Sequence, residues 1–134
     1  MMAESIFGIH ETAFRVRSAR AEVLANNLAN SDTPNFKARD IDFRAALKDA
    51  HGDFGSSERF EMARTNSGHI AAETVSSTSA FLMYRQPTQP ALDGNTVEAH
   101  IEKAKFMENG IQQTATLEFL NGKIKGIRGA LKGE

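Results

Sequence analysis

Four histidines are the side chains in this sequence that metal or acid–base chemistry would use first. They lie far apart, and neither a His-Glu-x-x-His motif nor another metal-ligand spacing joins them. The chain has no cysteine, which excludes thiolate nucleophiles, disulfides and cysteine-based zinc sites together. We therefore predict no metal centre and no cofactor site around these histidines, which are His10, His51, His69 and His100.

One pair of carboxylates, Asp40 and Asp42, has a spacing at which general acid–base catalysis is conceivable. Arg39 and Arg44 flank the pair, so an exposed salt-bridge patch or a helix cap is the stronger interpretation. Neither a glycine-rich phosphate loop nor a Gly-x-Ser-x-Gly nucleophile elbow occurs in the sequence. These observations predict that the protein is not an enzyme.

Cations gather close to the C-terminal end of the chain. They would suit a phosphate-binding tail, but cations near a helix C-terminus also offset the helix dipole and keep the surface soluble, which is the stronger interpretation. The net charge of −1 gives no reason to expect nucleic acid or an anionic membrane as the main partner. The cations in question are Lys123, Lys125, Arg128 and Lys132.

Membrane and export signals are not apparent in the sequence. No apolar run approaches the roughly 20 residues that a transmembrane helix needs. The first residues lack the basic region and the apolar core of a secretory signal peptide. Taken alone, these features predict a cytoplasmic protein without a membrane span.

The 134 residues have room for a single domain, residues 1–134, which we divide into three segments. Residues 5–30 carry apolar side chains at helical spacing, with Arg20 interrupting the stripe, and predict a long N-terminal helix. Residues 31–94 lack this periodicity and predict an irregular, extended middle segment. Residues 95–133 are periodic again and predict a long C-terminal helix.

The middle segment has room for a short helix and one β-hairpin. Asp40 is placed to cap a helix through Ile41 and Leu47. Residues 60–63 alternate apolar and polar side chains, as a short strand would. Pro87 and Pro90 exclude a central strand around them.

The C-terminal segment combines a start signal with two apolar stripes. Asn95 and Glu98 have the spacing of a capping box. The two stripes are out of phase, so we expect the buried face of the helix to rotate near residues 114–117. The first stripe is Val97, Ile101, Ala104, Ile111 and Ala115, and the second, at coiled-coil spacing, is Leu117, Leu120, Ile124, Ile127 and Leu131.

Four glycines make this last helix marginal by itself. Each costs about 1 kcal/mol in a helix interior, a large fraction in total of the roughly 5–15 kcal/mol that stabilises a small domain. We therefore expect the terminal segments to be largely disordered in the free monomer and to fold on assembly. Glycine also permits close helix approach, and the four positions are Gly110, Gly122, Gly126 and Gly129.

The sequence Ala-Asn-Asn-Leu-Ala-Asn-Ser-Asp-Thr-Pro-Asn-Phe-Lys, residues 25–37, closes the first helix. Asparagine suits a helix interior poorly, and Thr33 before a proline is disfavoured from the helical region. We expect the helix to end near Asn30, within a few residues. Asn27 is then either part of a simple C-terminal turn or a buried residue whose amide needs partners and fixes the register of packed helices.

This stretch, with its continuation Ala-Arg-Asp-Ile-Asp-Phe to residue 43, resembles the N-terminal signature of bacterial flagellar rod and hook proteins, and of proximal rod subunits of FlgB type in particular. Residues 84–97, Tyr-Arg-Gln-Pro-Thr-Gln-Pro-Ala-Leu-Asp-Gly-Asn-Thr-Val, and residues 118–125 are similar to the same subunits. The similarity spans nearly the whole chain in the family's order. Two departures stand out: Asn35 replaces a glycine common in axial proteins, and residues 112–114 replace a stretch that often contains tyrosine.

The resemblance implies a mainly α fold, with long N- and C-terminal helices paired as an antiparallel-type coiled coil or bundle. It implies a structural subunit of the proximal rod that polymerises through these helices to help form the drive shaft and export channel. The implied partners are copies of itself, other rod proteins, and basal-body and export-gate components at the base of the rod. The implied location is the periplasmic rod of the basal body, reached by type III export without cleavage of a signal peptide, in place of the cytoplasm.

The predicted assembly interface lies on the two terminal helices. Its residues are Val16, Leu24, Asn27, Leu28, Asn30, Leu117, Leu120, Ile124, Ile127 and Leu131. The same stripes would serve a small helical adaptor that binds one partner helix in its groove, a second hypothesis from a different functional class. Sedimentation and circular dichroism separate the two, because an adaptor is a folded monomer or dimer with constant helicity, whereas an assembly subunit gains helicity on polymerisation.

Overall fold

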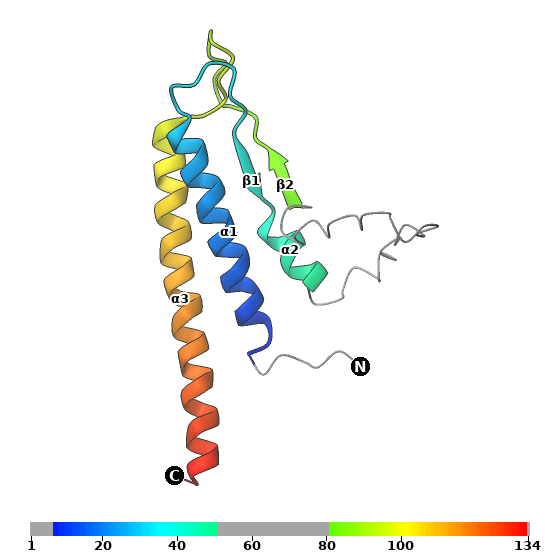
Figure 1. The fold of residues 1–134 in the computed structure, drawn as a ribbon, viewed down its shortest axis with the longest axis vertical. Coiled ribbons are helices and arrows are strands. Elements are labelled where there is room, and N and C mark those ends of the chain that lie inside the picture. Colours follow the sequence, from blue (N-terminus) through cyan, green and yellow to red (C-terminus); the bar gives the residue numbers. More distant parts are fainter. Residues whose placement is uncertain (1–6, 51–80, 134) are drawn as a thin grey trace, which may run out of the picture.

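The computed structural model describes residues 7–50 and 81–133 of the chain. It is mainly helical, as predicted, and two long helices run side by side in opposite directions (Figure 1). The strand predicted at residues 60–63 lies outside the described residues. In chain order the elements are α1 (Ile9–Ala29), β1 (Arg39–Ile41), α2 (Phe43–Ala50), β2 (Leu82–Tyr84) and α3 (Ala99–Lys132).

Helix α1 begins later than predicted and ends where predicted. Gly8 precedes it with φ +55°, a left-handed conformation that favours glycine and separates residue 7 from the helix. At the other end, the N–H of Asn30 donates to the carbonyls of Asn26 and Asn27 at 3.2 and 3.1 Å. The predicted helix end near Asn30 is confirmed.

Helix α2 is capped by Asp42, and the prediction that Asp40 caps it is wrong. The Asp42 carboxylate accepts the N–H of Ala45 at 2.9 Å, and the Asp42 carbonyl accepts the N–H of Ala46 at 3.0 Å. Asp40 lies one position outside this geometry, in the middle of β1, where its carboxylate is used by arginines instead.

Helix α3 begins at Ala99, and the predicted capping box at its start is also wrong. Glu98 is the N-cap residue but makes no side-chain cap hydrogen bond; its carboxylate instead accepts the N–H and the hydroxyl of Thr88. The Asn95 amide donates to the carbonyls of Asn30 and Ser31 at 3.1 and 2.7 Å. Asn95 therefore closes the end of α1, where carbonyl groups lack helical partners.

The two strands form an antiparallel pair in which Asp40 lies opposite Met83. Backbone hydrogen bonds continue beyond the strand ends, from the N–H of Arg85 to the carbonyl of Ala38 at 2.9 Å and from the N–H of Asp42 to the carbonyl of Phe81 at 3.0 Å. The middle segment thus contains a strand pair, as predicted, but Ile41, which was expected in the short helix, lies in β1. Pro87 and Pro90 fall outside the strands, as predicted.

The apolar core is small and gathers around α1, which contacts α3 as well as β1 and α2. Val16, Ile41 and Ala46 are buried together at this junction, and Phe43 packs against them. Leu24, further along α1, has no exposed surface at all. Because this apolar core is small, polar contacts do much of the work of holding β1 in position.

The face of α3 that packs on α1 is polar, contrary to prediction. Its buried residues are Glu102, Asn109 and Thr116, at seven-residue intervals. Two of them have partners outside α3: Glu102 meets Asn27 and Arg85, and the Asn109 amide donates to the carbonyl of Arg17 at 2.9 Å. Hydrogen bonds thus lie at the contact between α3 and α1, where apolar side chains of α3 were expected to pack.

The two apolar stripes of α3 lie elsewhere. At about 100° per residue they fall on roughly opposite sides of the helix. Ala104, Ile111 and Ala115 of the first stripe are exposed on the side away from α1. The second stripe continues the α1-facing side, but α3, with 34 residues, extends past the start of the 21-residue α1 (Figure 1), so much of it is exposed.

The turn between α1 and β1 depends on Asn35, whose φ of +60° is left-handed. Asparagine tolerates this conformation better than other non-glycine residues. We expect Asn35→Gly to leave the free energy of unfolding unchanged or slightly higher, and Asn35→Ala to lower it by about 1 kcal/mol. Urea unfolding of the two variants tests this, and equal stabilities would contradict it.

Candidate assembly interface

The structure divides the ten predicted interface residues into a buried and an exposed group. Val16, Leu24 and Asn27 are buried within their own chain. Leu28, Asn30 and Leu120 are partly buried. The exposed group consists of Leu117, Ile124, Ile127 and Leu131, whose exposed fractions are 42, 36, 37 and 83%.

Three residues of the exposed group, Ile124, Ile127 and Leu131, line a groove on the part of α3 that extends beyond α1. The groove encloses about 300 Å³, and its walls are almost entirely apolar. Phe7, just before α1, contributes one wall, and Ile124, Ile127 and Leu131 contribute the other. One turn higher, the rings of His10 and Phe119 meet with centroids 5.8 Å apart. The described residues leave this apolar surface uncovered.

A second apolar surface lies higher on α3, on the side away from α1. Met107 and Ile111, one turn apart, are 69 and 71% exposed there. A Cβ added to Gly110 would meet nothing within 4 Å. Glycine at this position therefore does not serve close packing within the chain, and the face is open to another molecule.

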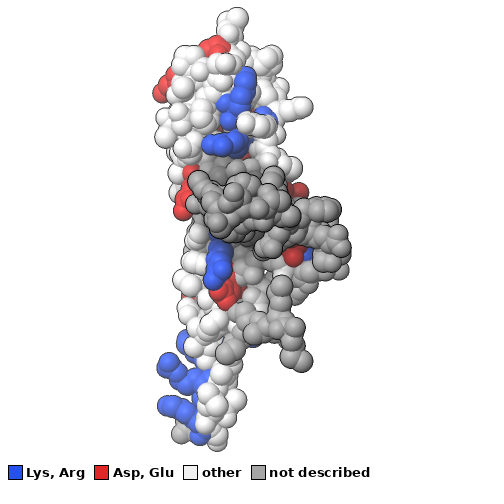
Figure 2. All heavy atoms as spheres, turned by 45° about the vertical axis from the view of Figure 1, so that its right-hand side comes forward, with Lys and Arg blue, Asp and Glu red and all other residues white. Residues whose placement is uncertain are grey.

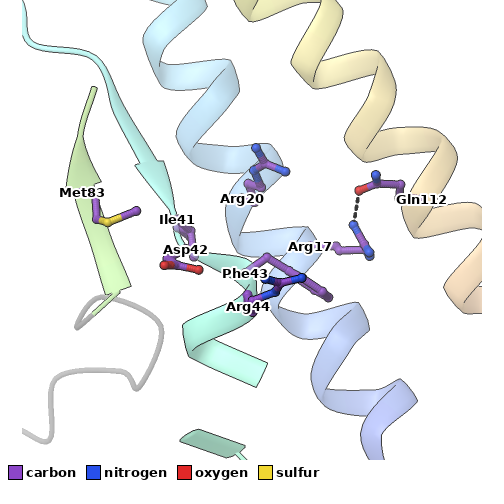
Figure 3. Close-up of a pocket in the computed structure, with 8 residues that line it drawn as sticks. All are labelled: Arg17, Arg20, Ile41, Asp42, Phe43, Arg44, Met83 and Gln112. Atoms are coloured by element: carbon purple, nitrogen blue, oxygen red, sulfur yellow. Dashed lines mark hydrogen bonds between the residues drawn. The ribbon is translucent and has the colours of Figure 1, made fainter. Parts of the chain in front are cut away.

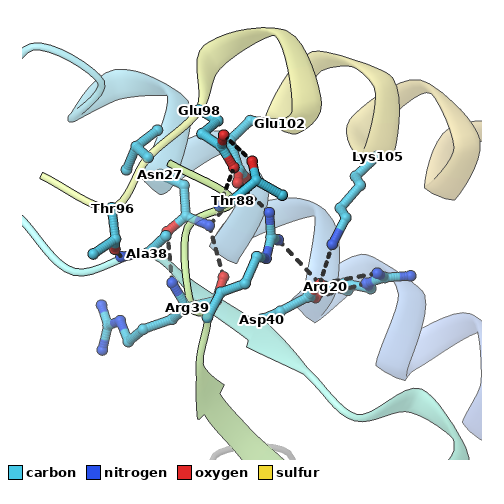
Figure 4. A network of polar contacts seen from close by, with 12 residues as sticks. Arg20, Asn27, Ala38, Arg39, Asp40, Thr88, Thr96, Glu98, Glu102 and Lys105 are labelled. Atoms are coloured by element: carbon cyan, nitrogen blue, oxygen red, sulfur yellow. Dashed lines mark hydrogen bonds and ion pairs between the residues drawn. The ribbon is translucent and has the colours of Figure 1, made fainter. Parts of the chain in front are cut away.

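Asn27 is held by three hydrogen bonds, all within the chain (Figure 4). Its amide nitrogen donates to the carbonyl of Arg39 at 2.6 Å and to the carboxylate of Glu102 at 3.1 Å. Its amide oxygen accepts the N–H of Arg39 at 3.1 Å. The hypothesis of a buried, paired Asn27 is confirmed, and the pairs join α1 to β1 and α3.

An ion cluster that the sequence analysis did not identify adjoins this amide (Figure 4). Arg20 binds the Asp40 carboxylate through two nitrogens, at 2.8 and 3.0 Å. Arg85 bridges Asp40, at 3.1 Å, and the buried Glu102. One feature of the sequence could have indicated this cluster. Arg20 interrupts the apolar stripe of α1, and it does so because the Asp40 carboxylate of β1 faces it.

Asp40 makes the stability of this cluster dependent on pH. Burial raises the pKa of the Asp40 carboxyl, but the hydrogen bond and the charge of Arg20 outweigh it, so the net pKa lies below its usual 3.8. A lowered pKa adds stability that is fully present above the unfolded-state pKa of about 3.9 and is lost as the pH falls further.

We therefore expect Asp40→Asn to lower the free energy of unfolding by about 2 kcal/mol at pH 7, and this difference from the wild type to shrink below pH ~4. Urea unfolding of both proteins across the pH range tests it. Asp49→Asn on α2 is a matched control, because no pairing of that side chain is seen in the described part of the chain. A difference that stays constant with pH would contradict the assignment.

A cleft of about 480 Å³ opens beside the cluster, between α1, α2, β2 and α3 (Figure 3). Arg17 lies over the ring of Phe43, 4.1 Å from its centroid, and donates to Gln112. Burial lowers the pKa of Arg17. The cleft carries no set of groups arranged for catalysis, and its lining residues are Arg17, Arg20, Ile41, Asp42, Phe43, Arg44, Met83 and Gln112.

Positive charge gathers at the free end of α3. Figure 2 shows lysine and arginine side chains over its last turns. Within residues 7–50 and 81–133, no histidine and carboxylate side chains are grouped as metal ligands would be. None of the described helices has a stretch long and apolar enough to cross a lipid bilayer.

Comparison with known proteins accounts for this architecture. The family described as "Flagella basal body rod protein" matches residues 8–37, which comprise α1 and the turn after it. The flagellar basal body rod protein FlgB of Aeromonas hydrophila is 46% identical over 132 residues, covering 98% of this chain and 96% of that protein.

Two further relatives carry the same name. FlgB of Escherichia coli K12 is 40% identical over 123 residues, which cover 91% of this chain and 89% of the relative. FlgB of Cereibacter sphaeroides is 41% identical over 127 residues, which cover 95% of this chain and 94% of the relative. The match extends through both long helices and the strand pair, and the chain belongs to the FlgB family of flagellar basal body rod proteins.

Proposed function

We propose that this chain is a non-enzymatic structural subunit of the proximal rod of the bacterial flagellar basal body. It polymerises through its terminal helices and helps to form the drive shaft and the export channel. Its neighbours are copies of itself, other rod proteins, and basal-body and export-gate components at the base of the rod. It reaches the periplasmic rod by export without cleavage of a signal peptide.

The observation that carries this proposal is the uncovered apolar surface of α3. Met107, Ile111, Ile124, Ile127 and Leu131 are all more than a third exposed, on two sides of one helix. Contiguous apolar surface of this kind marks sites of protein–protein contact. Two separate surfaces on one subunit suit a heterologous contact repeated around a tube.

The polar network gives the subunit a preformed part. Asn27, Asp40, Glu102 and their arginine partners tie α1, β1 and the first turns of α3 together. The far end of α3 has no comparable ties among the described residues. We therefore still expect the far end of α3 to be disordered in the free monomer and to fold on assembly. We expect the middle of α1 and the start of α3 to be folded already in the monomer.

Cysteine labelling tests the proposal, since the chain has no cysteine of its own. Ile127→Cys and Ile111→Cys should react rapidly with a maleimide in the free subunit and at least about tenfold more slowly in isolated basal bodies, because assembly buries both positions. Arg15→Cys, on the exposed side of α1, serves as a comparison site. Equal labelling of free and assembled protein at both isoleucine positions would refute assembly through α3.

A further inference from the structure

The apolar groove at the free end of α3 has a strongly one-sided charge. Residues 119–133 contain four cations and no aspartate or glutamate. Arg128 lines the groove itself. The Lys123 ammonium lies at the start of α1, 3.3 Å from where a Cβ on Gly8 would be, on the other side of the groove. Cations therefore flank the apolar strip on both sides.

The helix dipole explains only one of these cations. Its field falls off within the last turn of a helix, and Lys132 is the only basic residue in the last turn of α3. Lys123 and Arg128 lie further from the helix end, beside apolar residues that the described chain leaves uncovered. A different reason is needed for positive charge beside an apolar groove.

We propose that this groove receives an amphipathic helix of a neighbouring rod subunit whose apolar stripe is flanked by carboxylates. This inference rests on the proposed function and specifies the chemistry of the partner. Apolar residues of the incoming helix would pack on Ile124, Ile127 and Leu131, and its carboxylates would lie against Lys123 and Arg128. Complementary charge of this kind selects the partner and fixes its register.

The same charges exclude one occupant. In a two-fold self-pairing each groove faces the same groove of a second copy. Lys123 and Arg128 would then face the cations of the same groove in the second copy, and like charges brought together in an interface disfavour the contact. The contact at this groove is therefore heterologous, between unlike surfaces.

Charge reversal inside and outside the groove tests the inference. Arg128→Glu reverses a charge that lines the groove, and Lys125→Glu makes the same change on the preceding turn, at a side chain that does not line it. In a bacterial host that lacks the wild-type form of this protein, we expect Arg128→Glu to reduce recovery of the subunit in basal bodies at least about tenfold. Arg128→Lys and Lys125→Glu should stay within about twofold of the wild type.

Motile revertants of Arg128→Glu identify the partner. We expect second-site changes that replace aspartate or glutamate by lysine or arginine on a helix of another axial subunit or of another region of this chain. Equal recovery of the Arg128→Glu and Lys125→Glu variants would overturn the inference, even if labelling at Ile127 upholds assembly through α3. Binding of the wild type to phosphatidylglycerol vesicles but not to phosphatidylcholine vesicles, abolished by Arg128→Glu, would assign the cations to lipid and also overturn it.

Discussion

The double variant Ile124→Asp, Ile127→Asp should be almost absent from basal bodies, with motility lost, although the protein is still produced. Both side chains line the apolar groove of α3. A partner that packs there would bury two unpaired carboxylates, and burial of even one unpaired charge costs several kcal/mol. A loss of well over a hundredfold in incorporation is expected, since every 1.4 kcal/mol is tenfold in affinity.

The free subunit should tolerate the same change, because both isoleucines are more than a third exposed. Circular dichroism of the purified variant is therefore expected to match the wild type. Asn121→Asp adds a negative charge about one turn before Ile124, at an exposed residue that does not line the groove, and should assemble normally. Wild-type incorporation of the double variant would show that this end of α3 faces solvent in the rod.

The second large effect is expected at Asn27, and it concerns stability. Asn27→Ala removes the two donors and the acceptor that join α1 to β1 and Glu102. Glu102 is 1% exposed, so its carboxylate would lose a partner without gaining water. Because unpaired buried groups cost about 1–3 kcal/mol each, we expect a loss of about 3 kcal/mol in the free energy of unfolding.

Asn26→Ala is the matched control, one residue away and exposed. It should be neutral or slightly stabilising, because alanine is the better helix former. Urea unfolding of both variants, followed by recovery in basal bodies, separates the two positions. If Asn27→Ala were as stable as Asn26→Ala and still failed to assemble, Asn27 would act at a subunit contact, as the sequence analysis proposed.

Much of the backbone could be predicted because it follows from local signals. The helix end near Asn30 depends on asparagines and on Pro34, four residues after Asn30. The absence of a strand at Pro87 and Pro90 depends on the missing proline N–H. Such features are fixed by neighbours in sequence, so one sequence suffices to predict them.

The cluster around Asp40 could not be predicted, because its members come from α1, β1, the segment after β2, and α3. Arg20, Arg85 and Glu102 are brought together only by the fold, and each one looks like a surface charge in its own stretch of sequence. Asp40 and Asp42 were predicted to form an exposed salt-bridge patch or a cap. Asp42 is the cap, whereas Asp40 is only 16% exposed and pairs with distant arginines. Only the position of β1 decides between them.

The apolar stripes of α3 misled for a physical reason. Periodicity shows that a helix has an apolar side, but it does not show which molecule covers that side. Inside this chain, Glu102 and Asn109 lie at the contact with α1, where the Glu102 carboxylate accepts from Asn27 and the Asn109 amide nitrogen donates to the carbonyl of Arg17. The isoleucines were predicted to lie in an interface, and that part remains a prediction for the assembled rod.

The hydrogen bonds from Asn95 to Asn30 and Ser31 also determine when folding can be completed. They join residues 65 and 64 positions apart in the chain, and closing a flexible loop of that length costs about 4 kcal/mol in chain entropy by logarithmic scaling. The end of α1 thus lacks its final partners until nearly three quarters of the chain is present. If the chain moves through a narrow passage with its N-terminus first, the end of α1 cannot form these hydrogen bonds until Asn95 has emerged. The subunit can then complete its fold only near the end of transit.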